Sequence, residues 1–213
     1  LYFCLNNQNF KNKVDLSFGD DDKEYFRELI RAARENIKKK RVAIVLTEDF
    51  TFTYYIKSLV ENSDINFVVL GNFSESFISS FENHFDNVVL EDVGFSRKNI
   101  GLGNLLTIFR ISHKLRKHNV DQVITLMPKA NILGQIAAII SKKKHRYMIS
   151  TGNIWLDKVG IKKKMFLNLE RFCIFLASVV VADSKSQYDL MVKTYYSQKK
   201  KLRYVNGLSV RDF

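Results

Sequence analysis

The residues with the chemistry to hold a polar ligand lie in two short segments, each at the end of an apolar run. The first segment is Pro128-Lys129-Ala130-Asn131 and the second is Ser150-Thr151-Gly152-Asn153. A lysine at the start of a helix favours an anion, short hydroxyl and amide side chains can donate and accept hydrogen bonds, and glycine lets a ligand approach the backbone closely. We therefore expect a ligand site that includes Lys129, Asn131, Thr151, Gly152 and Asn153.

Two of these residues have an equally good structural explanation. Lys129 fits a lysine that points into solvent, and Asn131 is placed to cap the helix that follows it.

A third segment, Thr47 to Thr51, follows the first apolar run and adds Asp49 and Thr51 to the candidates for ligand contact. The segment has no glycine that would bring backbone amides close to a phosphate, so we do not expect a pyrophosphate there. Asp49 is the one candidate for a catalytic group. Its alternative role is the N-cap of the next helix.

Several other chemistries lack the residues they need. Gly101-Leu102-Gly103 resembles part of a dinucleotide fingerprint, but no third glycine or acidic partner follows at the required spacing. The chain has no Ser/His/Asp arrangement, no cluster of metal ligands and no close pair of carboxylates. Its two cysteines, Cys4 and Cys173, form no CxxC motif, which favours a reduced, cytoplasmic setting. We expect neither a metal nor a cofactor.

From Arg41 onward, apolar runs of strand length alternate with segments of helical periodicity. Strict alternation predicts an α/β fold with a Rossmann-like, doubly wound, mostly parallel sheet. The carboxyl ends of parallel strands meet at one edge, where α/β proteins usually bind ligands, so we expect the polar segments to come together there. The expected strands are 41–47, 65–70, 87–91, 122–126, 146–150, 178–182 and 201–205, and the expected helices are 51–62, 74–83, 104–118, 131–141, 162–177 and 185–195.

The chain of 213 residues divides at the first of these strands. Residues 1–40 are a predicted N-terminal extension, in which Asp20 to Lys40 has the periodicity of one helix. Residues 41–213 are the predicted Rossmann-like domain.

The segment Ile161 to Ala177 is apolar around most of its circumference. Five residues form one stripe at helical spacing, which favours burial in the core. Three lysines near the start of the segment leave an alternative, a helix that lies against an anionic membrane surface. We expect burial of the stripe, which consists of Ile161, Met165, Leu169, Phe172 and Leu176.

The net charge of +12 comes with four basic runs, at residues 38–41, 142–146, 162–164 and 199–201. Such runs attract nucleic acid, anionic lipid or a phosphorylated ligand. Lysines also gather at helix ends, where they interact favourably with the helix dipole, and this explains any single run equally well. Four runs together favour a polyanionic partner.

Four stretches of the sequence carry a family resemblance: PKANILGQIAA, STGNIW, GIKKKMFLNLERFCIFLASVVVADSKSQ and RYVNGLSVRDF. In this order and spacing they resemble the N-terminal half of a family 4 glycosyltransferase. Within that family, the closest likeness is to bacterial enzymes of capsule, O-antigen and lipooligosaccharide (lipopolysaccharide) assembly. The similarity covers residues 41–213 and implies one half of a GT-B architecture, in which two Rossmann-like domains face each other across the active site.

The resemblance also implies partners. In such enzymes the N-terminal domain mainly binds the acceptor, often a lipid-linked sugar at the cytoplasmic face of the membrane, and the C-terminal domain binds the nucleotide-sugar donor. Such enzymes usually retain the anomeric configuration and need no metal. The resemblance implies that the donor-binding domain lies outside these 213 residues, that Asn206-Gly207 serves as an interdomain hinge, and that this chain alone is inactive. Family members often have histidines where this chain has Leu126 and Thr151, so no general base is assigned.

Two other classes of function remain open. A non-catalytic Rossmann-like module that binds a polyanion such as nucleic acid would account for the charge, but no RNA-binding signature is present, so we expect no nucleic-acid partner. A sugar-nucleotide epimerase has a similar two-domain architecture, but this chain lacks a phosphate loop and carboxylate acid/base groups. We therefore expect the acceptor-binding domain of a retaining glycosyltransferase of surface-polysaccharide biosynthesis, cytoplasmic and peripheral to the inner face of the membrane.

Overall fold

The computed structural model describes residues 40–61, 63, 65–82, 85–95 and 102–205. The chain divides into two units, Leu1–Lys39 and Lys40–Phe213, and every described residue belongs to the second. The predicted hinge Asn206-Gly207 and the predicted helix Asp20 to Lys40, apart from Lys40 itself, lie outside the described residues.

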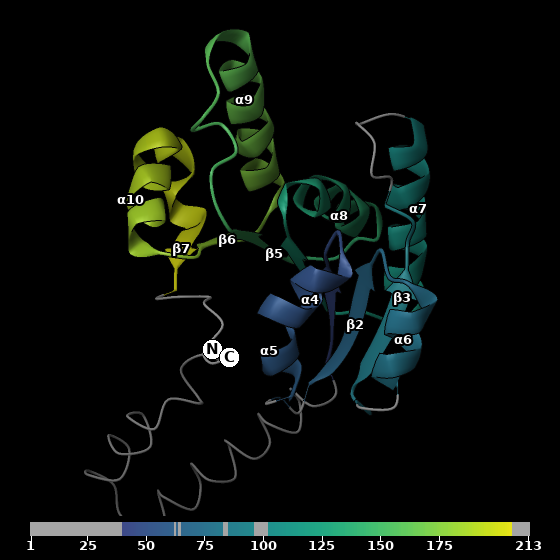
Figure 1. The fold of residues 1–213 in the computed structure, drawn as a ribbon. Coiled ribbons are helices and arrows are strands. Elements are labelled where there is room, and N and C mark those ends of the chain that lie inside the picture. The colour runs from purple at the N-terminus through teal and green to yellow at the C-terminus, as the bar shows by residue number, and fades with distance from the viewer. Residues whose placement is uncertain (1–39, 62, 64, 83–84, 96–101, 206–213) are drawn as a thin grey trace, which may run out of the picture. The chain divides into compact units, whose positions relative to one another are not determined.

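The described residues form one sheet of seven strands in the order β3-β2-β1-β4-β5-β6-β7 (Figure 1). Every neighbouring pair of strands is parallel. The predicted Rossmann-like α/β fold is thus confirmed, with each strand within two residues of its expected bounds. The strands are β1 (Arg41–Val45), β2 (Asn66–Gly71), β3 (Val88–Asp92), β4 (Gln122–Leu126), β5 (His145–Ser150), β6 (Val179–Ala182) and β7 (Leu202–Tyr204).

Helices occupy the segments between the strands. The predicted helix 51–62 is two short helices that are separated at Ile56. The helices are α4 (Asp49–Tyr55), α5 (Lys57–Glu61), α6 (Glu75–Glu82), α7 (Leu102–Lys117), α8 (Pro128–Ile140), α9 (Gly160–Leu176), α10 (Lys185–Thr194) and the 3-10 helix η1 (Tyr196–Lys201).

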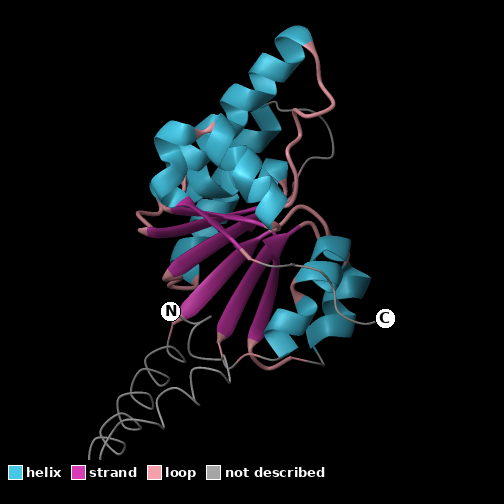
Figure 2. Cartoon of the chain, turned by 90° about the vertical axis from the view of Figure 1, so that its left-hand side faces the viewer, coloured by secondary structure: helices cyan, strands magenta, loops and turns pink. Residues whose placement is uncertain are grey.

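Helices cover both faces of the sheet (Figure 2), which explains why β1 is apolar at consecutive positions. Ala43 and Val45 pack into a cluster with α7 and α8, whereas Val42 and Ile44 pack into a second cluster with α4, α5 and α6. A third cluster joins α9 and α10 to β5, β6 and β7. A strand buried on both faces carries apolar side chains throughout.

Helix α8 packs closely on the sheet because its buried face carries small residues. A Cβ atom added to Gly134 would lie 2.7 Å from Cγ2 of Thr125 and 3.3 Å from Cβ of Val45. Ala137 and Ala138 on the same helix are fully buried. This packing places the N-terminus of α8 directly at the carboxyl edge of the sheet.

The prediction that the apolar stripe of α9 is buried is wrong for most of its length. Ile161 is 87% exposed, Met165 is 55% exposed and Phe172 is 46% exposed. The helix instead buries a neighbouring face that includes Glu170, Cys173 and Ile174. The reason is visible in both views: the first turns of α9 project beyond the sheet (Figures 1 and 2), so the sheet cannot cover them.

Candidate functional site

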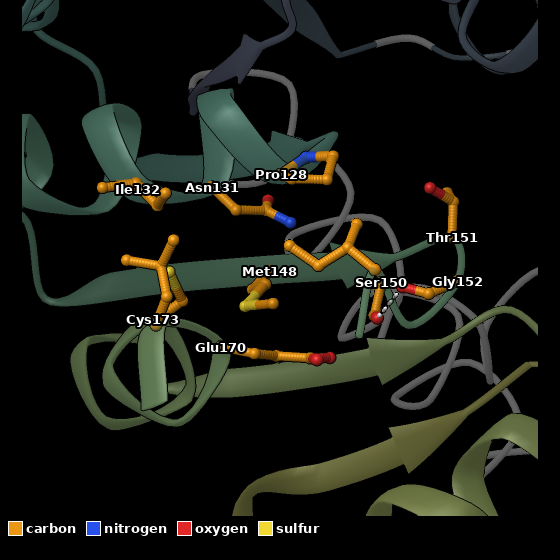
Figure 3. A pocket seen from close by; sticks show the side chains of 11 residues that line it. Pro128, Asn131, Ile132, Met148, Ser150, Thr151, Gly152, Glu170 and Cys173 are labelled. Atoms are coloured by element: carbon orange, nitrogen blue, oxygen red, sulfur yellow. Dashed lines mark hydrogen bonds between the residues drawn. The ribbon is translucent and has the colours of Figure 1, made fainter. Parts of the chain in front are cut away.

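A cavity of about 40 Å³ lies at the carboxyl edge of the sheet, between α8, α9 and the end of β5 (Figure 3). Three residues predicted to contact a ligand line it: Asn131, Thr151 and Gly152. They come from the two polar segments singled out in the sequence, one after β4 and one after β5. The parallel pairing of these strands brings both segments to the same edge.

The connection from β4 to α8 is strained. Met127 has φ 75° and ψ 146°, a region of backbone angles that essentially only glycine populates. Such a conformation costs about 1–3 kcal/mol and is typically found at functional sites. The hydroxyl of Thr151 lies 3.9 Å from Sδ of Met127, so the two loops of the site are in contact.

Asn131 lies in the first turn of α8 and is not its cap. The N-cap is Met127, which contributes no side-chain hydrogen bond. Only 4% of Asn131 is exposed; its Nδ2 donates to the carbonyl oxygen of Ile149 at 3.2 Å, and its Oδ1 has no hydrogen-bond partner. The Ile149 carbonyl accepts and cannot donate, so it fixes which end of the amide is the nitrogen. Asn131 thus lines the cavity, while its amide oxygen is a buried acceptor without a partner.

Glu170 of α9 is a buried carboxyl group on the opposite wall. Its Oε1 accepts from Asn153 Nδ2 and its Oε2 from the hydroxyl of Tyr195, both at 3.0 Å. The indole nitrogen of Trp155 lies close enough to influence the carboxyl group but makes no hydrogen bond of good geometry. Burial raises the pKa of Glu170, against the lowering effect of these donors. The carboxyl group ties the loop after β5 to α9 and to the end of α10.

The remaining polar groups of the cavity are held by the protein itself. Ser150 Oγ accepts from Gln187 Nε2 of α10 at 3.0 Å, which fixes the end of β5. Burial raises the pKa of the Cys173 thiol to about 12, so this cysteine is neutral at physiological pH and is not a nucleophile.

The other predicted ligand residues lie outside the cavity. Thr51 is fully buried in α4 and its hydroxyl has no partner. Asp49 is the first residue of α4, follows the N-cap Glu48 and accepts from the backbone of Phe50 at 2.7 Å. Lys129 is half-buried in the first turn of α8. Asn153 contributes indirectly, because its side chain holds Glu170.

Sequence reasoning missed Glu170 and the apolar walls formed by Ile132, Met148 and Leu169. The sequence contains one indication of Glu170. It is the single acidic residue of α9, and it shares a helix face with the apolar residues Cys173 and Ile174, three and four positions later. That face is buried in the structure.

Positive charge is unevenly divided between the two edges of the sheet. The basic runs 142–146 and 199–201 lie where β5 and β7 begin, and Lys40 and Arg41 lie where β1 begins, so these cations are at the amino edge, opposite the cavity. Only Lys162–Lys164, at the start of α9, follows a loop from the carboxyl edge. Within the described part of the chain, no three metal-ligating side chains come together.

No protein-family model and no curated protein sequence matches the chain. Solved structures do match it, and they share one Rossmann-like half of a GT-B-like architecture. A UDP-N-acetylglucosamine 2-epimerase from Rickettsia bellii aligns with a TM-score of 0.57 at 12% identity, over 79% of this chain and 44% of the epimerase. A glycosyltransferase from Rickettsia africae aligns with a TM-score of 0.53 at 15% identity, over 78% and 42% of the two chains. Anabaena HepE in complex with UDP-glucose aligns with a TM-score of 0.50 at 14% identity, over 78% and 43%.

These likenesses define the fold as one half of a GT-B-like architecture. The chain spans less than half the length of each of these structures. At such identities the match shows the fold alone. The fold is shared by enzymes that transfer sugars and by enzymes that epimerise them, and it is not specific to family 4 glycosyltransferases.

Proposed function

We propose that this chain is the acceptor-binding half of a retaining glycosyltransferase that moves a sugar from a nucleotide-sugar to a lipid-linked acceptor in surface-polysaccharide assembly. The observation that carries the proposal is the cavity at the carboxyl edge, which gathers Asn131, Thr151 and Gly152 from two different strand ends. The fold is the one in which HepE was solved with UDP-glucose. A second Rossmann-like domain, not among these residues, would bind most of the donor.

The test is a transfer assay on the complete gene product that carries this chain. Asn131→Ala should raise the acceptor KM about tenfold, the effect of one lost hydrogen bond of about 1.4 kcal/mol, while the donor KM stays unchanged. Asn104→Ala is the control, since Asn104 of α7 is equally buried and its amide oxygen, like that of Asn131, has no partner, but Asn104 does not line the cavity. A rise in the donor KM with an unchanged acceptor KM would assign the cavity to the donor and refute the acceptor role.

We also propose that α9 brings this edge to an anionic membrane surface. Val159 and Ile161 are 83% and 87% exposed, and the exposed lysines Lys162 and Lys164 stand beside them. Apolar side chains beside lysines suit a helix that lies in the headgroup region. In the part of the chain that the structure describes, no helix has the length and apolar character to cross a bilayer.

The membrane proposal can be tested with two variants of equal charge. Changing all three residues of Lys162–Lys164 to glutamine should reduce co-sedimentation with phosphatidylglycerol vesicles more than the same change in Lys142–Lys144, which lie at the amino edge. Binding should also fall with salt, because charge is screened within about 10 Å at 0.1 M. Equal losses in both variants would show attraction to the overall charge and not to α9.

A sugar-nucleotide epimerase is the second candidate, because several of the structures that share the fold are UDP-N-acetylglucosamine 2-epimerases. The two functions differ in their acceptor. An epimerase converts the nucleotide-sugar with no second substrate, whereas the proposed transferase releases the nucleotide only when an acceptor is present. A non-catalytic module that binds a polyanion would do neither and would instead show salt-dependent binding through the amino edge.

A further inference from the structure

The loop between β5 and α9, residues 151–159, contributes Thr151, Gly152 and Ile154 to the cavity wall. Tight packing at its ends does not fix its conformation. Gly152 and Gly160 have φ angles of 140° and 59°, which glycine adopts without steric cost. A Cβ atom added to either glycine would meet no atom within 4 Å. Contacts between the two glycines must therefore hold the loop against the rest of the fold.

The loop is anchored by two buried side chains, Asn153 and Trp155, which are 8% and 5% exposed. Asn153 Nδ2 donates to Oε1 of Glu170 on α9 at 3.0 Å. In the described part of the chain, no other side-chain hydrogen bond joins residues 153–159 to another element. The indole of Trp155 lies close to the same carboxyl group. Glu170 is therefore the polar anchor of the loop.

Glu170 is an unusual residue for its position. It is 6% exposed, and its neighbours on the buried face of α9 are Cys173 and Ile174, so packing alone would favour an apolar side chain. Burial of a carboxyl group costs free energy unless its oxygens are hydrogen-bonded. Here each oxygen accepts one hydrogen bond of 3.0 Å, from Asn153 and from Tyr195. Buried carboxyl groups in the wall of a cavity are found mainly at functional sites.

We propose that Glu170 is a positioning residue for the acceptor: through Asn153 it holds the loop so that Thr151 and Gly152 line the cavity. The Glu170 side chain extends from α9 toward the end of β5, where the loop begins (Figure 3). The residue acts on the loop and not on the reacting atoms. The inference rests on the proposed function, because it assigns the group that shapes the acceptor site.

The carboxyl group provides a matched control, because its two hydrogen bonds have the same length and reach different elements. Asn153 belongs to the loop, whereas Tyr195 follows α10 and is 1% exposed. A Glu170 that served only the fold would depend on both bonds alike. A positioning Glu170 depends on the Asn153 bond for the acceptor and on the Tyr195 bond only for stability.

The first test measures the acceptor KM of the complete gene product. Asn153→Ala should raise this KM about tenfold, the effect of one lost hydrogen bond to a charged group, whereas Tyr195→Phe should change it by less than about twofold. Glu170→Ala should match Asn153→Ala, and the double variant should be no weaker than either, because all three lose the same hydrogen bond. Glu170→Gln should restore most of the affinity that Glu170→Ala loses, since its amide oxygen still accepts from Asn153.

The second test needs no sugar transfer. Trp155 is the one tryptophan of the chain, so its fluorescence reports the position of the loop. In the 213-residue chain, Asn153→Ala should release the loop and raise the acrylamide quenching constant of Trp155 at least about twofold. Tyr195→Phe should leave this constant unchanged.

An equal rise in acceptor KM for Asn153→Ala and Tyr195→Phe would overturn the inference, because Glu170 would then serve the fold alone. That comparison holds even if Glu170→Ala does not fold. A complete gene product that transfers no sugar, with Trp155 responding as expected, would refute the proposed function and leave the positioning of the loop intact. Sugar transfer with an unchanged acceptor KM and unchanged Trp155 quenching in Asn153→Ala would refute the positioning role alone.

Discussion

Replacement of Glu91 by glutamine should destabilise the fold strongly at neutral pH and much less in acid. Glu91 lies on the edge strand β3 and meets three basic side chains from the end of α7. Its Oε1 lies 3.0 Å from Lys117 Nζ and 2.7 Å from His118 Nε2, and its Oε2 pairs with Lys114. Only 16% of the Glu91 side chain is exposed, so solvent screens these interactions weakly.

The magnitude follows from the pKa of the carboxyl group. Burial raises this pKa, but hydrogen bonds from Lys114, His118 and Lys117 outweigh burial and lower it from 4.5 to about 2. The folded state therefore binds its proton less readily than the unfolded state. The stabilisation is fully present above about pH 4.5 and is lost as the pH falls toward 2. The difference between a pKa of 4.5 and one of about 2, at about 1.36 kcal/mol per pKa unit, corresponds to about 3 kcal/mol.

Urea unfolding at pH 7 and pH 3 would measure this. Glu91→Gln keeps an acceptor oxygen, so we expect a loss of about 2–3 kcal/mol at pH 7 and less than half of that at pH 3. Glu61→Gln is the matched control: Glu61 is 42% exposed and lies 3.9 Å from Lys57, and such a pair contributes at most about 0.5 kcal/mol. A loss for Glu91→Gln that stays below about 1 kcal/mol at pH 7, or that is the same at both pH values, would refute the reasoning.

Three further predictions concern the packing of α8 and α9. Gly134→Val should lower the free energy of unfolding by about 2–3 kcal/mol in urea, because the added atoms meet Thr125 at a distance that requires α8 to move; an unchanged midpoint would show that α8 is free to shift. Cys173 should react with iodoacetamide at least about 100-fold more slowly in the native protein than in urea, because burial disfavours its thiolate, and equal rates would contradict its burial. Lys201→Met should cost about 1–2 kcal/mol in thermal unfolding, because the Lys201 ammonium donates to the carbonyl oxygens of Ile174, Phe175 and Ala177 at the end of α9. The control is Lys200→Met, which changes an exposed position and should have no effect.

Most of the fold could be predicted from the sequence because strands buried on both faces and helices of regular periodicity leave strong local patterns. The seven strands follow from short apolar runs, and their parallel arrangement follows from the alternation with helices. The meeting of Asn131 with Thr151 and Gly152 also follows, because parallel strands end at one edge.

The features that could not be predicted depend on contacts between distant parts of the chain. The periodicity of α9 shows which residues share a face but not where the sheet ends beneath that face, so the exposure of Ile161 and Met165 was not foreseeable. An asparagine near a helix start commonly caps it, yet α8 begins at Pro128, before Asn131, which leaves Asn131 to bond β5 instead. The role of Glu170 depends on Asn153 and Tyr195, which are 17 and 25 residues away.

The net charge of +12 does not show which cations stabilise the fold and which are available to a partner. The positions of these cations in the structure do. Several cations at the amino edge serve the fold: Arg146 donates to the carbonyl oxygens of Leu176 and Lys143, and Lys201 caps α9. These groups stabilise helix ends and are turned away from the cavity. The cavity lies at the carboxyl edge, and the basic run on that side is Lys162–Lys164 on the projecting part of α9. Attraction of a polyanion by the amino edge and binding of a ligand in the cavity are therefore expected at different places, and a variant that removes one should leave the other intact.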